Sequence, residues 1–335
     1  MKTIKLMEVC GTHTMAIAKA GIKRLLPDNV RLISGPGCPV CVTPQSHIDR
    51  AIEISREDNV IMTTFGDMMR VPGSRGSLEN KKRDGFDVRV VYSSLDALKI
   101  AEDNPDKKVV FMGVGFETTS PTIAATVLEA KRKKIRNFYI LANFKLIFPA
   151  LTKIAKSKGL KISGFICPGH VSVITGSSPY ERIAARYKIP CVITGFEEGD
   201  IIAGIERLIR QIKKGTKNVE IGYKRAVKKE GNRAALRILN AVFEPEDSEW
   251  RGLGIIKKSG LKLRKKYGAF DAGKQFNIRL PKVVKNKACI CGEIIQGAKS
   301  PSDCSLFKKI CTPQNPVGPC MVSSEGTCAA YYKYA

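Results

Sequence analysis

Short apolar runs recur at nearly constant intervals along the first two thirds of the chain. They predict strands at Ile4–Val9, Val30–Ser34, Val60–Thr64, Val88–Tyr92, Val109–Val114, Phe138–Ala142, Ile162–Ile166 and Cys191–Thr194. Helical periodicity fills most of the intervals between them, as at Ser46–Arg56, Pro121–Lys134, Ile147–Lys158 and Gly199–Lys214. Strands that alternate with helices are typical of β-α-β units, so we expect an α/β fold with mainly parallel sheets.

The chain of 335 residues is long enough for two or three domains, at roughly 150 residues each. Eight strands fit one large sheet or two four-stranded domains, and the polar stretch Glu102–Lys108 favours a boundary between two domains. We therefore expect two similar parallel-sheet α/β domains, over 1–105 and 106–215. A basic linker and helical region with a small cysteine-rich module would follow over 216–335.

Positive charge is concentrated in the stretch 206–287. This stretch holds 23 Lys and Arg against 8 Asp and Glu, and so contributes 15 of the net charge of +26. A solvated helical linker is the plainest interpretation, and an acidic partner is the other. Aromatic residues make up only 7% of the chain, and no basic motif with interleaved aromatics occurs, so we expect no nucleic-acid partner.

Eleven cysteines are the most informative feature of the composition. No apolar run approaches the roughly 20 residues that span a bilayer. The first residues resemble no export signal, so we expect a cytoplasmic protein without a membrane partner. In a reducing compartment, clustered cysteines indicate metal or redox chemistry more often than structural disulfides.

Reactive side chains follow the predicted strands again and again. Because ligands bind beyond the carboxyl ends of parallel strands, we expect these side chains to line a polar, thiol-rich cleft. Those directly after strands are Cys10, His13, Cys38, Cys41, Asp67, Glu117, Cys167, His170 and Glu197. The chain has neither a G-x-G-x-x-G motif after a strand nor a phosphate-binding Gly-Lys-Ser/Thr loop, which argues against classic dinucleotide and P-loop enzymes.

Cys38 and Cys41 form a C-x-x-C motif in a loop rich in glycine and proline. Such a pair is either a dithiol/disulfide couple or two soft metal ligands.

His13 lies three residues after Cys10. It either orients or deprotonates the Cys10 thiol or makes a structural hydrogen bond. Glu117 and Asp67 are acid/base candidates or helix caps. Cys167 and Cys191 have no partner by spacing and are predicted to be core residues.

The last 50 residues hold six cysteines, at Cys289, Cys291, Cys304, Cys311, Cys320 and Cys328. Six thiolates exceed the four that one tetrahedral zinc or one [4Fe–4S] cluster needs. Four ligands plus one redox pair is the simplest division. The alternative is a structural zinc site with two spare thiols.

Several motifs together resemble the HypD family of hydrogenase maturation (formation) proteins. They are MEVCGTHT from Met7, GPGCPVC from Gly35, GVGFETT from Gly113 and PGHVS from Pro168, followed by DCSLF, CTP and CMVSSEG in the tail. The resemblance runs in order along essentially the whole chain. The chain departs from the family pattern in lacking a few helical turns before MEVC and in its unusually basic stretch 206–287.

The resemblance implies a redox-active metallocentre assembly protein with two α/β domains and a third domain that carries a [4Fe–4S] cluster. It implies a monomer that joins a complex with a small HypC-type chaperone and a HypE-type cyanide donor. Together they would assemble the Fe(CN)2CO unit of [NiFe]-hydrogenase, with Fe(II), cyanide and CO as transient cargo. A cluster-driven thiol–disulfide reductase of a protein substrate is the alternative function.

The resemblance also implies roles for individual residues. Cys10, Cys38 and Cys41 would hold iron or exchange electrons, and His13, Asp67, Glu117 and His170 would line the same cleft. In the tail, a ferredoxin–thioredoxin-reductase-like arrangement would place the cluster on Cys289, Cys304, Cys311 and Cys328. Cys291 and Cys320 would then form the adjacent redox pair.

Overall fold

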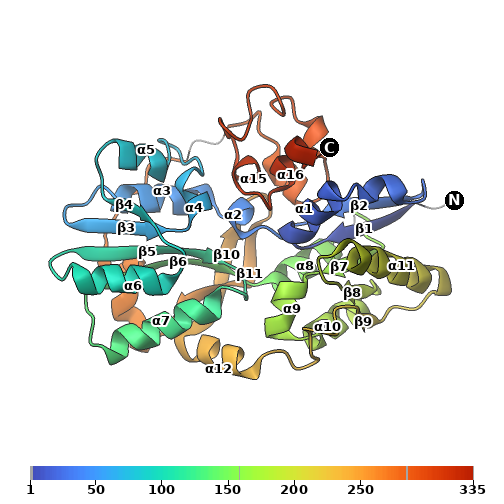
Figure 1. Cartoon of the computed structure of the whole chain (residues 1–335), viewed down its shortest axis with the longest axis horizontal. Coiled ribbons are helices and arrows are strands. Elements are labelled where there is room, and N and C mark those ends of the chain that lie inside the picture. The colour runs from blue at the N-terminus through green and yellow to red at the C-terminus, as the bar shows by residue number, and fades with distance from the viewer. Residues whose placement is uncertain (1–2, 158, 284–285, 335) are drawn as a thin grey trace. The chain divides into compact units, whose positions relative to one another are not determined.

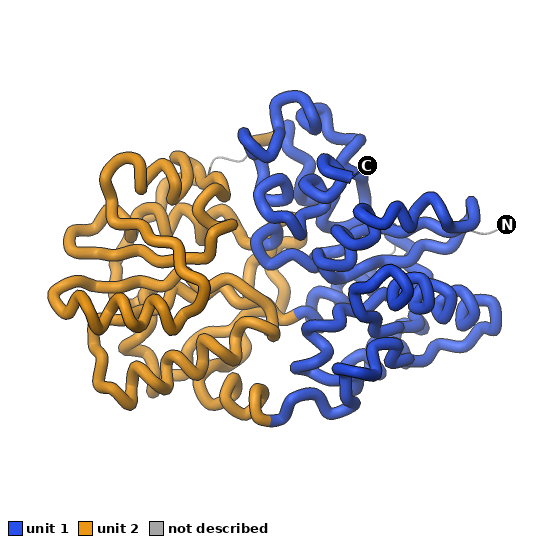
Figure 2. The backbone as a smooth tube through the Cα atoms, in the orientation of Figure 1, with its two compact units in different colours: residues 1–42, 147–233, 288–335 blue, residues 43–146, 234–287 orange. Residues whose placement is uncertain are grey.

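The computed structural model describes residues 3–157, 159–283 and 286–334. The chain divides into two compact units (Figure 2). Unit 1 comprises residues 1–42, 147–233 and 288–335, and unit 2 comprises 43–146 and 234–287. Among the described helices, none combines the length and the apolar character that crossing a membrane requires.

Both units are assembled from segments that are far apart in the sequence. The first segment of unit 1 ends at Val42, and the chain returns to this unit at Ile147 and at Ala288. The compact units therefore differ from the expected consecutive ranges 1–105, 106–215 and 216–335. The polar stretch Glu102–Lys108, expected to be a boundary, lies inside unit 2, where it connects a helix to the next strand. It is polar because this turn is exposed to solvent.

Unit 1 is built on a five-stranded sheet with the order β2-β1-β7-β8-β9, and all of its pairs are parallel. Its strands are β1 (Ile4–Glu8), β2 (Val30–Ser34), β7 (Gly164–Cys167), β8 (Cys191–Ile193) and β9 (Val219–Ile221). The helices of the two α/β segments are α1 (Gly11–Lys19), η1 (Ile22–Leu25), α2 (Pro39–Val42), α8 (Ile147–Ala155), α9 (Gly169–Thr175), α10 (Ser178–Tyr187) and α11 (Glu198–Lys214). The core between the sheet and two of these helices contains Leu6 from β1, Ile17 from α1 and Leu208 from α11.

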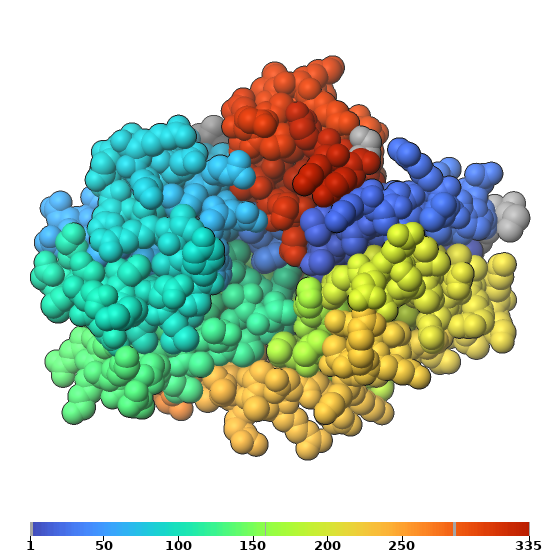
Figure 3. Space-filling view, viewed as in Figure 1, coloured from blue at the N-terminus to red at the C-terminus, as the bar shows by residue number. Residues whose placement is uncertain are grey.

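The cysteine-rich tail belongs to unit 1. Its helices are α14 (Cys291–Ile295), η3 (Pro301–Asp303), α15 (Pro319–Val322) and α16 (Thr327–Tyr334). Helix α16 packs against α1, and α15 packs against α2. In the space-filling view the red tail accordingly lies directly against the blue N-terminal segment (Figure 3).

Unit 2 is built on a six-stranded mixed sheet with the order β10-β11-β6-β5-β3-β4. Its strands are β3 (Val60–Thr64), β4 (Val88–Val90), β5 (Lys108–Gly115), β6 (Phe138–Lys145), β10 (Phe243–Trp250) and β11 (Gly254–Leu263). The four strands from β6 to β4 are parallel, whereas β11 runs antiparallel to both β6 and β10. Figure 1 shows β4 at one border of this sheet.

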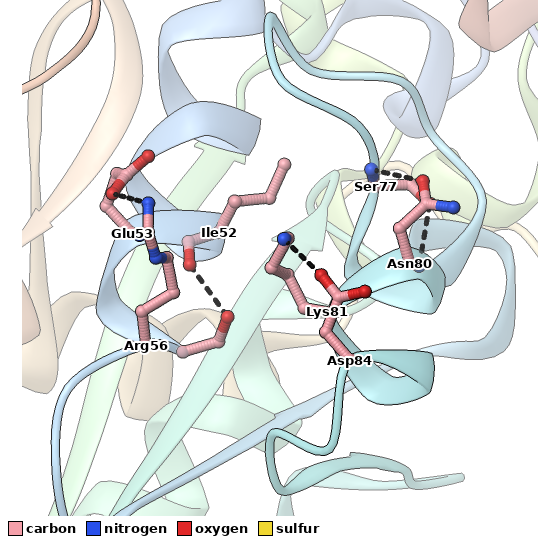
Figure 4. Close-up of polar contacts among 8 residues, drawn as sticks. Ile52, Glu53, Arg56, Ser77, Asn80, Lys81 and Asp84 are labelled. Carbon is pink, nitrogen blue, oxygen red and sulfur yellow. Dashed lines mark hydrogen bonds and ion pairs between the residues drawn. The ribbon is translucent and has the colours of Figure 1, made fainter.

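The helices of unit 2 follow the expected alternation. They are α3 (Gln45–Ile54), α4 (Gly66–Met69), α5 (Leu78–Arg83), α6 (Ser94–Asp103), α7 (Ser120–Arg132), α12 (Arg233–Val242), η2 (Lys265–Phe270) and α13 (Ala272–Gln275). The largest core of the unit joins Leu98 of α6 and Val127 of α7 to Phe111 of β5. Helix α5 begins at a capping box between Ser77 and Asn80 (Figure 4), in which each side chain accepts a hydrogen bond from the other residue's backbone N–H.

All eight predicted strands are confirmed as β1 to β8, with small shifts at their ends. The four predicted helices correspond to α3, α7, α8 and α11. Lys158, the expected end of the third helix, lies outside the described residues. The chain is thus an α/β protein with one parallel and one mixed sheet and a cysteine-rich C-terminal region.

The basic stretch 206–287, expected to be a solvated linker with helices, contains strands as well as helices. This stretch contributes β9, β10 and β11 as well as α12. Strand β10 is an edge strand with buried Phe243 and Trp250 at its two ends, and most of its polar side chains between them are exposed or only partly buried. A strand that faces solvent along its length needs few apolar residues, so its sequence lacks the usual strand pattern.

Candidate functional site

The loop after β1 presents Cys10 at the start of α1. Cys10 is extended, with φ −145° and ψ 130°, and only 9% of it is exposed. Burial raises the pKa of the Cys10 thiol to about 11, and the negative charge of Glu325 adds to this increase. The thiol is therefore protonated at neutral pH unless a metal ion displaces the proton.

The glycine-rich loop after β2 lies directly against Cys10. A Cβ atom on Gly37 would meet the Cα atom of Cys10 at 2.4 Å, so only glycine fits at this position. The amide of Gly11 donates a hydrogen bond of 3.1 Å to the carbonyl oxygen of Gly37. Because β1 and β2 are neighbours in the sheet, their loops bring Cys10 next to the segment that carries Cys38.

Cys38 directly precedes α2, and Cys41 lies within it. The sulfur atom of Cys38 accepts a hydrogen bond of 3.2 Å from the amide of Cys41. Both residues are buried, at 5% and 2% exposure. Burial is the main reason that the pKa of Cys41 is raised well above its ordinary value.

The Cys41 thiol points to the tail. It donates a hydrogen bond of 3.9 Å to the carbonyl oxygen of Pro319. The adjacent Cys320 is close enough to change the pKa of Cys41, and Cys41 changes that of Cys320. The sulfur atoms of Cys320 and Cys291 in turn lie 2.6 Å apart. Cys41 of the C-x-x-C motif, Cys320 and Cys291 are therefore successive neighbours in unit 1.

All six tail cysteines line one pocket, together with the apolar side chains of Ile294, Leu306, Phe307 and Met321. Gly318 also lines it, and a Cβ atom there would meet the sulfur of Cys289 at 2.9 Å. Among the described residues, no three His, Cys, Asp or Glu side chains are grouped so that they could hold a single metal ion. That finding covers both the pocket and the three thiols Cys10, Cys38 and Cys41.

The six cysteines that line the pocket are compatible with an iron–sulfur cluster. A cluster binds four cysteines around its own larger core. The glycine at position 318 leaves room beside the sulfurs, and the apolar lining excludes water.

His13 contacts the end of β8. Its Nε2 atom lies 2.8 Å from both the carbonyl oxygen of Gly195 and the hydroxyl oxygen of Thr194. Burial lowers the pKa of His13 to about 4, so the ring is neutral at pH 7 and donates its Nε2 proton to Gly195. The ring stacks on Phe196 at 4.7 Å, and His170 stacks on Phe196 at 4.0 Å. The structure thus brings the two histidines together around one aromatic ring.

Asp67 and Glu117 lie in unit 2. Asp67 is in α4, directly after β3, and Glu117 follows β5 and is 3% exposed. Both are at the carboxyl edge of their sheet, as the pattern predicted. Their grouping with the thiols of unit 1 stays a prediction.

Glu325 is a residue of the site that the sequence analysis missed. Its carboxylate accepts a hydrogen bond of 2.6 Å from the hydroxyl of Thr12, and its charge acts on both Cys10 and His170. It lies more than 300 positions from Thr12 in the sequence, and no local pattern links the two residues.

Cys167 and Cys191 are core residues, as predicted, with 0% exposure each. They lie on neighbouring strands, close enough to interact.

Comparison with known proteins covers the whole chain. The family model described as "HypD: Hydrogenase formation hypA family" matches residues 1–335. A hydrogenase maturation factor HypD of Cupriavidus necator is 47% identical over 336 residues, which cover 98% of this chain and 89% of the relative. A putative hydrogenase expression/formation protein of Methanocaldococcus jannaschii is 47% identical over 331 residues, which cover 99% and 92%.

The hydrogenase maturation factor HypD of Escherichia coli is 45% identical over 334 residues, which cover 99% of this chain and 90% of that protein. Identity at this level over nearly the full length of the chain is sufficient to establish a family. The chain belongs to the HypD family of hydrogenase maturation factors.

Proposed function

We propose that this chain is the scaffold and redox protein on which the Fe(CN)2CO unit of [NiFe]-hydrogenase is assembled. It would work in a complex with a HypC-type chaperone and a HypE-type cyanide donor. Its substrate would be iron that receives cyanide and CO. Thiolates among Cys10, Cys38 and Cys41 would bind this iron, and the three would have to move closer together to bind it at once. Thiolate is a soft donor suited to such iron.

The observation that carries this proposal is the run of thiols from the C-x-x-C motif into the tail. Cys41 neighbours Cys320, and Cys320 lies 2.6 Å from Cys291, sulfur to sulfur. A structural zinc module would not need a sulfur of the α/β fold beside its own thiols. This series of neighbouring thiols would carry electrons from the tail to Cys38 and Cys41.

The tail pocket supports the proposed division of its six cysteines. Cys291 and Cys320 are already in contact, so they are the pair that would form a disulfide with the least movement. Cys289, Cys304, Cys311 and Cys328 remain as the four ligands of a [4Fe–4S] cluster. When bound, this cluster supplies electrons one at a time.

The exchange between the two thiol pairs can be written with its atoms balanced. The thiolate of Cys320 attacks Cys41 in a Cys38–Cys41 disulfide, forms a Cys320–Cys41 bond and releases Cys38 as a thiolate. Cys291 then attacks Cys320 and releases Cys41. One disulfide is reduced, one is formed, and the two freed thiolates are able to bind iron.

The remaining cleft residues have proposed supporting roles. His13 is neutral and held by Gly195, so it would orient the loop rather than carry a charge. His170 is exposed and would be the proton carrier near the thiols. Asp67 and Glu117 would serve from unit 2 as acid/base groups toward the substrate.

The test is anaerobic co-purification with the HypC-type chaperone, followed by infrared spectroscopy and iron analysis of one sample. We expect stretching bands of metal-bound cyanide and CO, and about five irons per complex, four in the cluster and one as cargo. About four irons without these bands would favour the cluster-driven reductase of a protein substrate. A Cys38→Ala, Cys41→Ala variant that still carries the bands would refute the role of these thiols.

A further inference from the structure

Unit 1 has a basic pocket at the amino edge of its sheet, the edge opposite the one that carries Cys10 and His170. The pocket has a volume of about 540 Å³, and all the residues that line it belong to unit 1. Sites for small ligands usually have volumes of about 300–1,000 Å³. Its basic side chains are Lys5, Lys161, Lys188 and Lys217.

Each of these four lysines comes from the beginning of a different strand. Lys5 is the second residue of β1, and the other three precede β7, β8 and β9 by two or three positions. These four strands are consecutive in the sheet, and all of them are parallel. Because parallel strands begin at the same edge, the sheet itself gathers the four ammonium groups.

No carboxylate neutralises the pocket. Of the described residues that line it, none is acidic, and no ion pair joins any of the four lysines to a described acidic residue. Glu220 in the neighbouring β9 is already paired with Arg207, at 3.1 Å. Asp28 precedes β2 and does not line the pocket. The lysines are therefore available to an anion from outside the chain.

Two helix ends reduce the positive charge only in part. Lys188 caps the carboxyl end of α10, and Ile212 brings the last turn of α11 to the pocket wall. The carboxyl end of a helix carries roughly half a negative charge. The two ends together offset about one of the four lysine charges, so a clear positive excess remains.

Unpaired lysines alone do not make a site in a chain whose net charge is +26. Most of them are simply solvated. A pocket of unit 2 shows the difference, because Glu244, Glu246 and Asp271 line it together with its basic side chains. That pocket selects neither sign of charge, whereas the pocket at the amino edge of unit 1 selects anions.

The kinds of side chain in the pocket indicate the class of anion. Lysine binds phosphate as a point charge, whereas the planar carboxylate is matched best by the fork of arginine, and no described arginine lines the pocket. The hydroxyl of Ser163 accepts a hydrogen bond of 3.1 Å from the amide of Lys5, which leaves its own hydrogen to donate. No described aromatic side chain lines the pocket, so nothing there would stack on a nucleobase.

We propose that these four lysines form a binding site for a compact anion with two or more phosphate groups, of the pyrophosphate class. Several phosphate groups match several ammonium groups spread along four strand ends. Cys10 and His170 follow the carboxyl ends of β1 and β7, so the anion would bind without contacting them. The site is thus independent of the iron scaffold.

The test is titration calorimetry of the full chain with sodium pyrophosphate. Lys5→Gln and Lys188→Gln each remove one charge and are expected to weaken binding about fivefold or more. Lys134→Gln is the matched control, because Lys134 is also exposed, lies in unit 2 and has a φ of 60°, against 56° for Lys188. It should bind pyrophosphate as the wild type does.

Unchanged thermal unfolding would show that the variants are folded. A wild-type chain that does not bind pyrophosphate would overturn the proposal, as would wild-type affinity in both Lys5→Gln and Lys188→Gln. Citrate, an anion of similar charge without phosphate, should bind more weakly, and equal binding would refute the phosphate class. Displacement of pyrophosphate by a single-stranded oligonucleotide would assign the lysines to nucleic acid and also overturn the proposal. The infrared and iron measurements test the scaffold function separately.

Discussion

The hydroxyl of Thr12 donates a hydrogen bond of 2.6 Å to the carboxylate of Glu325, joining the first loop of unit 1 to the tail. The neighbouring backbone is also close to the tail, because a Cβ atom on Gly11 would meet the backbone oxygen of Glu325 at 2.6 Å. It places a negative charge beside the Cys10 thiol. The tail thus contributes to the site through a carboxylate as well as through its cysteines.

Glu325→Gln is expected to make Cys10 more acidic. The charge of Glu325 helps burial to raise the pKa of Cys10 to about 11, so the neutral amide should lower that pKa. The measurement is the rate of alkylation of Cys10 as a function of pH, read by peptide mass spectrometry. Glu325→Asp keeps the charge and serves as the control. An unchanged alkylation profile in Glu325→Gln would contradict the electrostatic role.

Cys320→Ser is expected to block reduction of a Cys38–Cys41 disulfide from the tail. Cys320 lies between Cys41 and Cys291, so its loss removes the intermediate thiol. The measurement is the appearance of free Cys38 and Cys41 after reduction of the cluster-loaded protein with dithionite. Cys191→Ala changes a core thiol outside this run and should leave the rate unaltered. Equal rates in Cys320→Ser and wild type would refute the route.

Gly37→Ala is expected to destabilise unit 1. The new methyl group would meet the Cα atom of Cys10 at 2.4 Å, and both segments are backbone that cannot move aside easily. Overpacking of this kind costs typically about 1–3 kcal/mol in free energy of unfolding. Chemical denaturation measures the change. Gly199→Ala is the control, because nothing lies within 4 Å of a Cβ atom there, and it should be neutral or slightly stabilising.

Lys145 should make stability depend on pH above neutrality. Its ammonium group is buried at 1% exposure and donates to Asn143, Ser248 and the carbonyl of Glu249. Burial lowers its pKa from 10.5 to about 7. Between these values the unfolded chain binds more protons than the folded one, so the contribution of Lys145 to the free energy of unfolding rises with pH from about 7 to 10.5.

The Lys145→Met variant should lack this rise. The measurement is the difference in free energy of unfolding between wild type and variant, obtained by denaturant titration at several pH values from 7 to 10.5. Lys274→Met, at an exposed position of α13, is the control for removing a lysine from unit 2. A difference that stays constant with pH would refute the lowered pKa.

Local patterns predicted the regular α/β part of the molecule well. The strands β3, β5, β6, β7 and β8 are almost entirely buried, and such strands appear in a sequence as continuous apolar runs. The same patterns failed for β10. β10 is an edge strand, and the residues between Phe243 and Trp250 are polar or proline. The sequence therefore lacks the apolar residues by which a strand is recognised. The expected domain ranges assumed that each domain is one continuous segment, whereas both compact units combine separate segments of the chain.

The sequence by itself determined the strand–loop positions of Cys10, Cys38 and Cys41, and the family through its motifs. These depend on residue types and short spacings, which local physics controls. Only the tertiary structure decided that unit 1 combines three separate segments, that Cys41 meets Cys320, and that Glu325 lies beside Cys10. Such contacts join residues about 280 to 315 positions apart, and burial of the whole core, rather than any local preference, selects them.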